Sequence, residues 1–294
     1  MKERILIVDG TYLAYRSFFA INNSAVALSN DEGFSTGTIL VFFKTLFTLI
    51  MEHRTTNVLV AFDAKGKTFR HQIYEQYKDG RAKTPQEFYD QVKIIKELLA
   101  LINIFHYEIE GFEADDIVAK VCSQYPDNYK LIFSADQDLN QLIDKNTSII
   151  KKYKNNIIIL NAYNFSDIYE FEPWQVVDYK AIVGDSSDNF FGIKGIGPKS
   201  AAKLLYEYKT LDNIYANLDK LKPNIAQKFE EYKDLAFRDQ KIARLVTNFD
   251  IPNLSLDSTS IYNLNLSEEA IELLDKYQLN SIKQKIAFLI KKLH

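Results

Sequence analysis

The sequence predicts an α/β fold, in which helices flank a mostly parallel central sheet, followed by a part that is entirely helical. Short apolar runs rich in β-branched residues alternate with longer amphipathic patterns up to about residue 172, as in sheets whose parallel strands are joined by helices. Beyond residue 173 helical patterns rich in Lys, Glu, Leu and Tyr take over. We therefore expect an α/β core over 1–172 and a helical subdomain over 173–294.

The elements follow from periodicity along the chain. Strands are expected where apolar residues run together, and helices where they recur every three or four positions. The expected strands are 4–8, 57–62, 104–109, 129–134 and 148–153, and the expected helices of the core are 36–53, 85–102 and 113–125. Helical patterns continue to about residue 246, a loop covers 257–265, and a last helix begins near residue 267.

Composition excludes several classes of protein. With 294 residues, 47% of them hydrophobic, the chain can form a substantial core. The first apolar run, residues 5–8, is too short for a signal peptide, and no stretch approaches the roughly 18 residues of a membrane span. We expect a soluble, cytoplasmic protein with no membrane partner. The single cysteine, Cys122, excludes an internal disulfide.

Carboxylates follow three of the expected strands. Asp9 closes the first strand, Asp63 closes the second, and Asp136 and Asp138 come directly after the strand at 129–134. The carboxyl ends of parallel strands meet at one edge of a sheet, so these side chains should converge there. One such Asp is often no more than a cap for the next helix, but four acids at three strand ends are harder to explain in that way.

Two further acidic clusters join this set. Glu113, Asp115 and Asp116 begin a helix in GFEADDIVAK, where the helix dipole alone favours acids. Asp185 and Asp188, in VGDSSDNFFG, are three residues apart and can point the same way. Nine converging carboxylates would repel one another strongly unless cations neutralised them.

The residue types of the acidic set indicate which cation it suits. The set contains no His or Cys, and ligation by oxygen alone favours Mg2+, with Mn2+ as a substitute, over zinc or copper. Two such ions side by side are the usual arrangement for cleaving phosphodiesters. Removing the nine acids from the net charge of −3 leaves +6 on the rest of the chain, so a metal-loaded protein can present a basic surface to a phosphate backbone.

A basic and aromatic segment runs from residue 65 to residue 89. The residues that recur at helical spacing, and would share one helix face, are Arg70, Tyr74, Tyr77 and Arg81, with Lys78 beside them. Cations that alternate with rings suit phosphate contacts and base stacking on a single strand. A solvated amphipathic helix would show the same spacing. Gly80 and Pro85 can interrupt the segment.

A glycine-rich stretch, GIKGIGPKSAAKLL at 192–205, fits neither of two nucleotide-binding motifs. Pro198 interrupts the phosphate-loop pattern, no strand precedes it, and the dinucleotide motif needs a different glycine order. What remains is a tight hairpin leading into a helix, where glycines let the backbone approach a phosphate or a cation. Lys199 and Lys203 would line one side of that helix. A plain turn between two helices is the alternative.

Taken together, these segments resemble the 5'-nuclease domain of bacterial DNA polymerase I, in the flap endonuclease superfamily. The resemblance rests on VDGTYLAYRSFF, FDAKGKTFRHQIYEQYKDGRAKTP, GFEADDIVAKV, SADQDLNQLI, VGDSSDNFFGIKGIGPKSAAKLL and, more weakly, IARLVTNFDIP, in the family's order and spacing. It implies a PIN-like core with a helical arch at about 68–100 and a helix-three-turn-helix element at about 186–210. Phe190-Phe191 and Glu172-Pro173 depart from the family pattern, which concerns local loop geometry.

The resemblance also implies a role for each group of residues. Asp9, Asp63, Glu113, Asp115 and Asp116 match the family's tighter metal site, and Asp136, Asp138, Asp185 and Asp188 match its second group. The catalytic residues at the base of the arch would be Arg70, Tyr77, Lys78 and Arg81. The residues expected to contact DNA are Arg16, Lys67, Tyr74, Lys83, Lys194, Gly195, Gly197, Lys199, Ser200 and Lys203, with a potassium ion in the hairpin.

The implied activity is that of a 5'-3' exonuclease and 5' flap endonuclease using two or more Mg2+ ions, in Okazaki fragment maturation, RNA primer removal and DNA repair. Its substrates would be DNA with 5' flaps, nicks or 5' ends, its functional partners a DNA polymerase and a ligase, and we expect a monomer associated with a bacterial nucleoid. A PIN-like ribonuclease and a nuclease-dead module that binds flap DNA remain as alternatives. Met1 and the helical end favour a stand-alone nuclease over a polymerase fragment.

Overall fold

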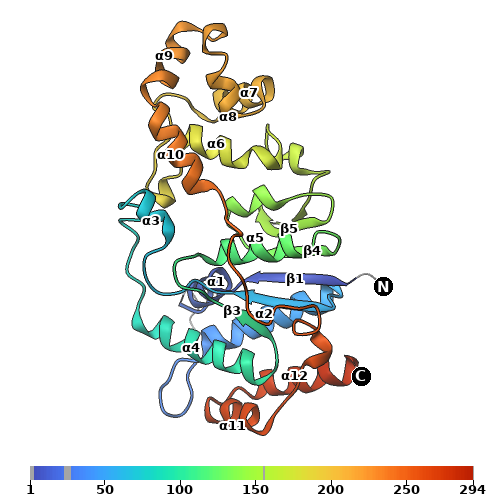
Figure 1. Ribbon diagram of the computed structural model, residues 1–294. Coiled ribbons are helices and arrows are strands. Elements are labelled where there is room, and N and C mark those ends of the chain that lie inside the picture. The colour runs from blue at the N-terminus through green and yellow to red at the C-terminus, as the bar shows by residue number, and fades with distance from the viewer. Residues whose placement is uncertain (1–2, 23–27, 155, 294) are drawn as a thin grey trace.

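A six-stranded sheet forms the centre of the molecule (Figure 1). The computed structural model describes residues 3–22, 28–154 and 156–293. The strands are β1 (Arg4–Asp9), β2 (Asn57–Ala61), β3 (Phe105–Tyr107), β4 (Tyr129–Phe133), β5 (Thr147–Tyr153) and β6 (Asn156–Leu160). Their order is β3-β2-β1-β4-β5-β6, with neighbours parallel from β3 to β5 and β6 antiparallel to β5.

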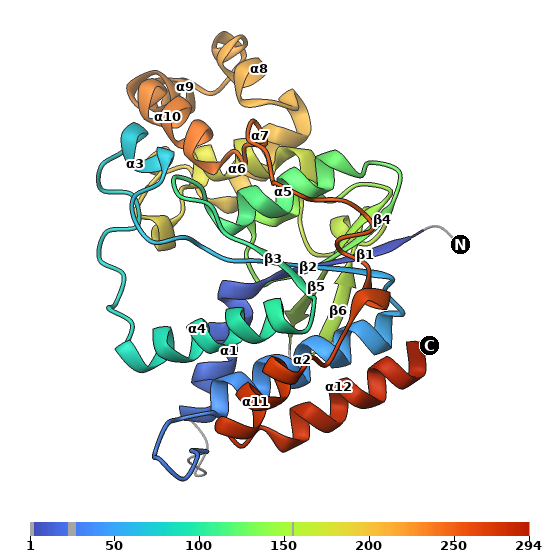
Figure 2. The same cartoon turned by 60° about the horizontal axis from the view of Figure 1, so that its bottom comes forward.

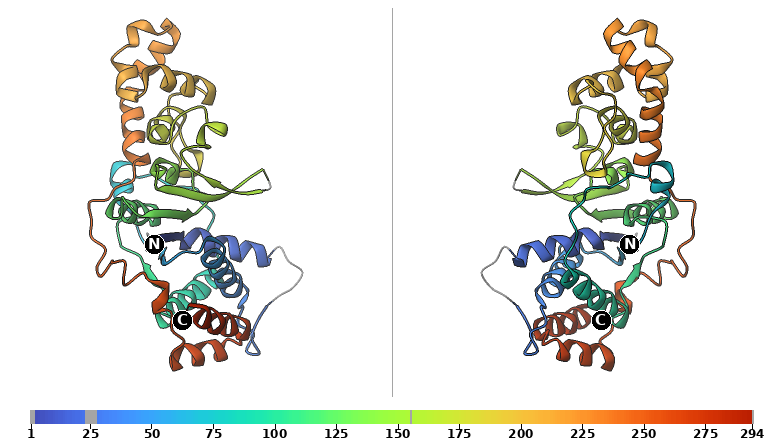
Figure 3. Two further views of the ribbon diagram at one scale, coloured as in Figure 1. Left: turned by 90° about the vertical axis from the view of Figure 1, so that its right-hand side faces the viewer. Right: turned by 90° about the vertical axis from the view of Figure 1, so that its left-hand side faces the viewer.

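The expected strands and the mostly parallel sheet are confirmed, with shifts of one or two residues at their ends. β1 is representative, since Leu6 and Val8 face one hydrophobic layer while Ile5 and Ile7 face the other, as the two-residue period of a strand requires. β6 was not expected from the sequence. It forms a hairpin with β5 that projects from the side of the molecule, as Figure 3 shows.

Helices cover both faces of the sheet (Figure 2). The helices of the N-terminal part are α1 (Gly10–Asn22), α2 (Gly37–His53), α3 (Phe69–Ile73), α4 (Gln86–Leu101) and α5 (Ala114–Gln124), with 3-10 turns η1 (Asp138–Leu142) and η2 (Phe165–Asp167). Side chains of α1, α2 and α4 pack on one face, and α5 packs on the other. The helices expected at 36–53, 85–102 and 113–125 are α2, α4 and α5.

The helical part has a hydrophobic core of its own. Its elements are η3 (Pro173–Gln175), α6 (Val176–Val183), η4 (Ser186–Asp188), α7 (Pro198–Tyr208), α8 (Leu211–Tyr215), η5 (Leu218–Lys220), α9 (Pro223–Glu231) and α10 (Lys233–Ala243). Buried Ile182, Leu205, Ile214 and Phe229 meet in this core. It lies at one end of the molecule, above the carboxyl ends of the strands in Figure 1.

The last fifty residues correct the expected domain boundary. The chain returns to the α/β core after α10. There Val58 N donates a hydrogen bond to Thr259 O, and Ile261 N donates one to Thr56 O. The elements that follow, η6 (Ile261–Asn263), α11 (Glu268–Lys276) and α12 (Asn280–Leu293), pack beside α4 and α2. Apolar side chains of α11 and α12 belong to the core on that face of the sheet, so they are not part of the helical subdomain expected over 173–294.

The described helices do not include any that is long and apolar enough to cross a membrane.

Candidate active site

The strand-end acids lie at one edge of the sheet. Asp9 ends β1, where its carboxylate accepts hydrogen bonds from Tyr12 N and from Ser134 Oγ, each at 2.8 Å. Ser134 directly follows β4, so this bond joins two neighbouring strand ends. Asp63, just beyond β2, accepts a hydrogen bond from Ala114 N at 2.8 Å. The first turn of α5 is thereby fixed to the same edge.

Four of the nine acids stand without a cation. Asp9, Asp63, Asp115 and Asp136 form no ion pair with a Lys or Arg side chain in the part of the chain that the structure describes. Burial and then the charge of Asp63 raise the pKa of Asp9 to about 7. Burial and then the charges of Asp136 and Asp9 raise the pKa of Asp115 well above its ordinary value. These four carboxylates therefore repel one another as expected.

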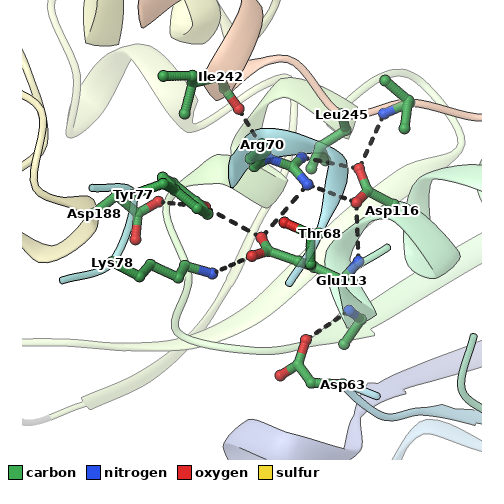
Figure 4. Close-up of polar contacts among 12 residues, drawn as sticks. Asp63, Thr68, Arg70, Tyr77, Lys78, Glu113, Asp116, Asp188, Ile242 and Leu245 are labelled. Atoms are coloured by element: carbon green, nitrogen blue, oxygen red, sulfur yellow. Dashed lines mark hydrogen bonds and ion pairs between the residues drawn. The ribbon is translucent and has the colours of Figure 1, made fainter. Parts of the chain in front are cut away.

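Arg70 and Asp116 form a buried ion pair (Figure 4). Their side chains are 2% and 0% exposed, and the guanidinium donates to both carboxylate oxygens, at 2.7 and 2.9 Å. Asp116 also accepts hydrogen bonds from Glu113 N and Val246 N. Arg70 Nε donates to Ile242 O at 2.9 Å. The pair thus fastens the start of α5 to α3 and to the chain that leaves α10.

This pair bears on two expectations. The buried Arg70 guanidinium contacts Asp116, backbone carbonyls and, at 3.5 Å, Glu113, and both oxygens of the buried Asp116 carboxylate accept hydrogen bonds from Arg70 and from backbone amides. The reason is position within α5. Asp116 is the third residue of the helix and turns back to the amide of Glu113, as in a capping box.

Three residues of the turn after α3 hold Glu113 and Asp188; Tyr77 and Lys78 are labelled in Figure 4. Lys78 Nζ lies 2.7 Å from Glu113 Oε1, and Arg81 Nη2 lies 2.7 Å from Asp188 Oδ1. Tyr77 Oη lies within hydrogen-bonding distance of both acids, at 3.2 and 3.0 Å. Although burial raises the pKa of Glu113, the charges of Lys78 and Arg70 lower it below its ordinary value. This basic turn therefore neutralises two of the expected metal ligands.

The turn also corrects the expected helix over the basic segment. α3 ends at Ile73, and Tyr74 has extended backbone with φ −147°. Lys78 and Gly80 take positive φ values of 60° and 84°, which a helix cannot contain. The residues expected on one helix face consequently separate, and Tyr77, expected to stack on a base, is only 2% exposed.

A buried lysine that the sequence analysis missed neutralises two more acids. Lys180 of α6 forms ion pairs with Asp138 and with Asp185, the latter at 2.7 Å. Although burial lowers the pKa of Lys180, the charges of Asp138, Asp136 and Asp185 raise it well above its ordinary value. No spacing in VDYKAIVGD marks this lysine, because its two partners come from different parts of the chain.

The nine acids thus lie in one region, but within the described residues they do not form a preformed metal-binding site. Within residues 3–22, 28–154 and 156–293 the structure contains no group of three or more His, Cys, Asp or Glu side chains that could hold an ion as they stand. The oxygen-only donors and the mutual repulsion of Asp9, Asp63 and Asp115 nevertheless suit divalent cations. Binding them requires some of the internal ion pairs to open.

The glycine hairpin is present before α7. Gly195 has a φ of 82°, which favours glycine, and Gly197 is followed by Pro198 at the first position of α7. The exposed residues expected to contact DNA here are Lys194, Lys199, Ser200 and Lys203. Lys228 of α9 donates to Gly195 O at 3.0 Å. The Gly195 carbonyl thus already has an ammonium as its partner, and the potassium ion in the hairpin stays a prediction.

The other residues expected to contact DNA are spread around the acidic edge. Arg16, Lys67 and Lys83 are exposed; Arg16 lies over the Phe133 ring, and Lys67 lies 4.0 Å from Glu75. The ring of Tyr74 is covered by the Arg238 guanidinium, 4.1 Å from its centre. One face of the Tyr74 ring is therefore covered within the protein, and its contact with DNA stays a prediction.

Comparison with known families identifies the class of protein that carries this site. The profile described as "5'-3' exonuclease, N-terminal resolvase-like domain" matches residues 4–170, and that described as "5'-3' exonuclease, C-terminal SAM fold" matches residues 171–266. The chain belongs to the 5'-3' exonuclease family. A 5'-3' exonuclease of Mycoplasmopsis pulmonis is 37% identical over 281 residues, 94% of this chain and 91% of that protein. The expected family and the nuclease class are confirmed.

Longer relatives and solved structures agree with this assignment. DNA polymerase I of Bacillus subtilis is 37% identical over 255 residues, which are 85% of this chain and 28% of that protein. The chain therefore spans under a third of that polymerase. The T5 D15 protein co-crystallised with metal ions matches with a TM-score of 0.71 at 20% identity, over 99% of this chain and all of that one.

Flap endonuclease-1 from Methanococcus jannaschii matches with a TM-score of 0.65 at 18% identity, over 100% of this chain and 94% of that one. At these identities the two structural likenesses concern the fold alone.

Proposed function

We propose that the chain is a structure-specific 5'-3' exonuclease and 5' flap endonuclease that hydrolyses DNA phosphodiesters with the help of divalent metal ions. The observation that carries the proposal is the charge pattern at the sheet edge. Asp9, Asp63, Asp115 and Asp136 lie there without an ion pair to any Lys or Arg of the described residues. Beside them is a turn whose Lys78 and Arg81 can exchange their carboxylate partners for a phosphate. Such an arrangement suits hydrolysis of a negatively charged backbone.

The metal ligands divide according to their present partners. We propose that Asp9, Asp63, Asp115 and Asp136 take a divalent ion most readily, because no basic side chain within the described residues pairs with them. The acids that would join them once their ion pairs open are Glu113, Asp138, Asp185 and Asp188. Two or more Mg2+ ions, for which Mn2+ substitutes, would lower the pKa of the attacking water and neutralise the scissile phosphate. Asp116 and Arg70 position α5 and touch neither ion nor DNA.

The remaining site residues bind and orient the substrate. Lys78 and Arg81 would stabilise negative charge at the phosphate, and Tyr77 would hold the turn against Glu113 and Asp188. Lys194, Lys199, Ser200 and Lys203 would contact the phosphates of the duplex at the hairpin and the start of α7. Arg16, Lys67 and Lys83, exposed near the acidic edge, would contact the strand that approaches it.

The biological setting follows from the substrate. An enzyme that removes 5' flaps and RNA primer ends would act in Okazaki fragment maturation and in DNA repair, beside a DNA polymerase that creates the flap and a ligase that seals the nick. The DNA polymerase I relatives, which carry a homologous segment, support this partnership. We propose that the chain acts as a monomer.

Cleavage of matched substrates tests the proposal. The protein and its Asp115→Asn variant are given a 5' flap in DNA, the same flap in RNA, and a blunt duplex, each in Mg2+, in Mn2+ and in EDTA. We expect cleavage of the DNA flap in either metal, none in EDTA, and a loss of about a thousandfold in the variant. Preferred cleavage of the RNA flap would support a ribonuclease instead. Tight flap binding without product in either metal would support a nuclease-dead module.

A further inference from the structure

One group of acids at the sheet edge contains its own cation. Lys180 is 7% exposed, and its ammonium bridges Asp138 and Asp185. The side chains of these two acids are 12% and 19% exposed. A lysine is rarely buried this deeply unless it is paired, and here it meets two carboxylates at once. The ammonium therefore occupies a position where a positive charge is required.

The partners of Lys180 come from the two parts of the protein. Asp138 begins η1, directly after β4, whereas Asp185 follows α6 in the helical part. Lys180 itself lies on α6, and Gly184 N donates to its carbonyl. Without a metal ion, this single ammonium thus joins the sheet edge to the helical part across their boundary.

Asp138 and Lys180 lie beside a pocket that is open to solvent. Asp138 Oδ1 is buried and lies against the Lys180 ammonium. A pocket of about 480 Å³ opens beside this group, and its lining includes Asp136, Lys180, Asp185 and Ser187. A hydrated cation can therefore reach Asp136 and Asp185 from solvent, whereas Asp138 Oδ1 is buried behind them.

Lys180 makes Asp138 and Asp185 differ from the neighbouring acids in the charge that an incoming metal ion meets. Asp9, Asp63 and Asp115 have no ion pair within the described residues, so a divalent ion meets no competing charge there. At Asp138 and Asp185 an incoming ion meets the Lys180 ammonium, and like charges at this separation disfavour each other strongly in a buried site. The two groups should consequently bind the same metal with different affinities.

We propose that Lys180 is a positioning residue that acts as the resident counter-ion of Asp138 and Asp185, holding them together without metal and competing with a divalent ion that binds there. The inference rests on the proposed metal dependence. Binding of a divalent ion by this second group depends on Lys180, since the ion must displace the ammonium before Asp138 and Asp185 can coordinate it. The ammonium displaced in this way lies beside the pocket, where a phosphate oxygen would neutralise it.

Calorimetric titration with MgCl2, together with melting temperatures in EDTA, tests the role of Lys180. The proteins compared are the parent, Lys180→Met, Lys180→Arg and the control Lys96→Met. The Lys96 ammonium lies 2.5 Å from Glu108 and, within the described residues, pairs with none of the nine acids. We expect a tight and a weak class of sites in the parent. Lys180→Met should tighten the weak class by about tenfold or more and lower the melting temperature in EDTA. Lys180→Arg and Lys96→Met should keep the parent's Mg2+ affinities.

The outcomes separate this inference from the proposed function. If the parent binds Mg2+ but Lys180→Met leaves the weak class unchanged or weaker, Lys180 does not compete with the ion and the inference is wrong. If the parent binds no Mg2+ at all, the proposed metal dependence itself fails. Should Lys180→Met not fold in EDTA, adding Asp185→Asn should restore stability by removing the excess negative charge. A double variant no more stable than the single one would contradict the counter-ion role.

Discussion

Arg70 and Asp116 should behave as one structural unit, so that replacing either alone destabilises the protein more than replacing both. Both side chains are buried and joined by two hydrogen bonds of 2.7 and 2.9 Å. Arg70→Met would leave the carboxylate buried with two backbone donors, Glu113 N and Val246 N, and would remove the donor to Ile242 O. Breaking a buried ion pair from one side costs about 3–5 kcal/mol.

The cost can be converted into a melting temperature. For domains of this general size about 1 kcal/mol corresponds to roughly 2–4 °C, so Arg70→Met should melt about 10 °C below the parent. The double variant Arg70→Met/Asp116→Leu should recover most of that loss, because no uncompensated charge stays buried. Scanning calorimetry and urea unfolding in EDTA measure both quantities, and the double-mutant cycle isolates the pair's coupling energy.

The same variants distinguish a structural from a metal-binding role for Asp116. Asp116→Asn should change the Mg2+ midpoint by less than about threefold while lowering stability, whereas Asp115→Asn should weaken Mg2+ binding by much more. The reasoning is refuted if Arg70→Met melts within about 2 °C of the parent. It is also refuted if Asp116→Asn abolishes Mg2+ binding without loss of stability.

Three further predictions follow from the acidic edge, the basic turn and the hairpin. Because the pKa of Asp9 rises from its ordinary value of 3.8 to about 7 on folding, metal-free protein should lose stability as pH rises from about 4 to 7, by up to about 4 kcal/mol from this group. Urea unfolding in EDTA that showed rising stability over this range would contradict the prediction. Lys78→Met should lower the maximal rate of flap cleavage about a hundredfold with a smaller effect on KM, and single-turnover kinetics would disprove this by showing an unchanged rate. Gly195→Ala should lower the free energy of unfolding by about 1–2 kcal/mol, since φ is 82° and the new Cβ would lie 2.5 Å from Lys228 Nζ. Gly197→Ala, with open space around the new Cβ, should lower it by under about 0.5 kcal/mol. Equal melting temperatures for the two variants would contradict this prediction.

Much of the fold could be predicted from the sequence because its signals are local. Runs such as RILIV at residues 4–8 are buried on both faces, and helices such as α2 show a continuous apolar face. β6 was missed because an edge strand with exposed Ile157 and Ile159 lacks a buried pattern. The return of α11 and α12 to the sheet could not be predicted, since an apolar helix face does not reveal which core it joins.

The residue types of the site could be predicted from the sequence, but the ion pairs between its acidic and basic side chains could not. Strand-end acids converge because parallel strands end together, which placed Asp9 and Asp63 correctly. Which acid meets which cation depends on tertiary contacts. Helical spacing placed Arg70 and Tyr77 on a surface, whereas positive φ values at Lys78 and Gly80 fold the segment back onto the acids. Lys180 belongs to no motif, and its role could not be predicted because its pairing with the acids depends on tertiary contacts.

The central claim, that this acidic edge cleaves 5' flaps in DNA with divalent metal, is tested most directly by the lengths of the products. A flap substrate labelled at its 5' end is incubated with the protein in Mg2+, and the labelled products are sized. We predict mononucleotides and short oligonucleotides, including one of the flap's full length released at the junction, and no product in EDTA. Products of random length, or cleavage that persists in EDTA, would contradict the account.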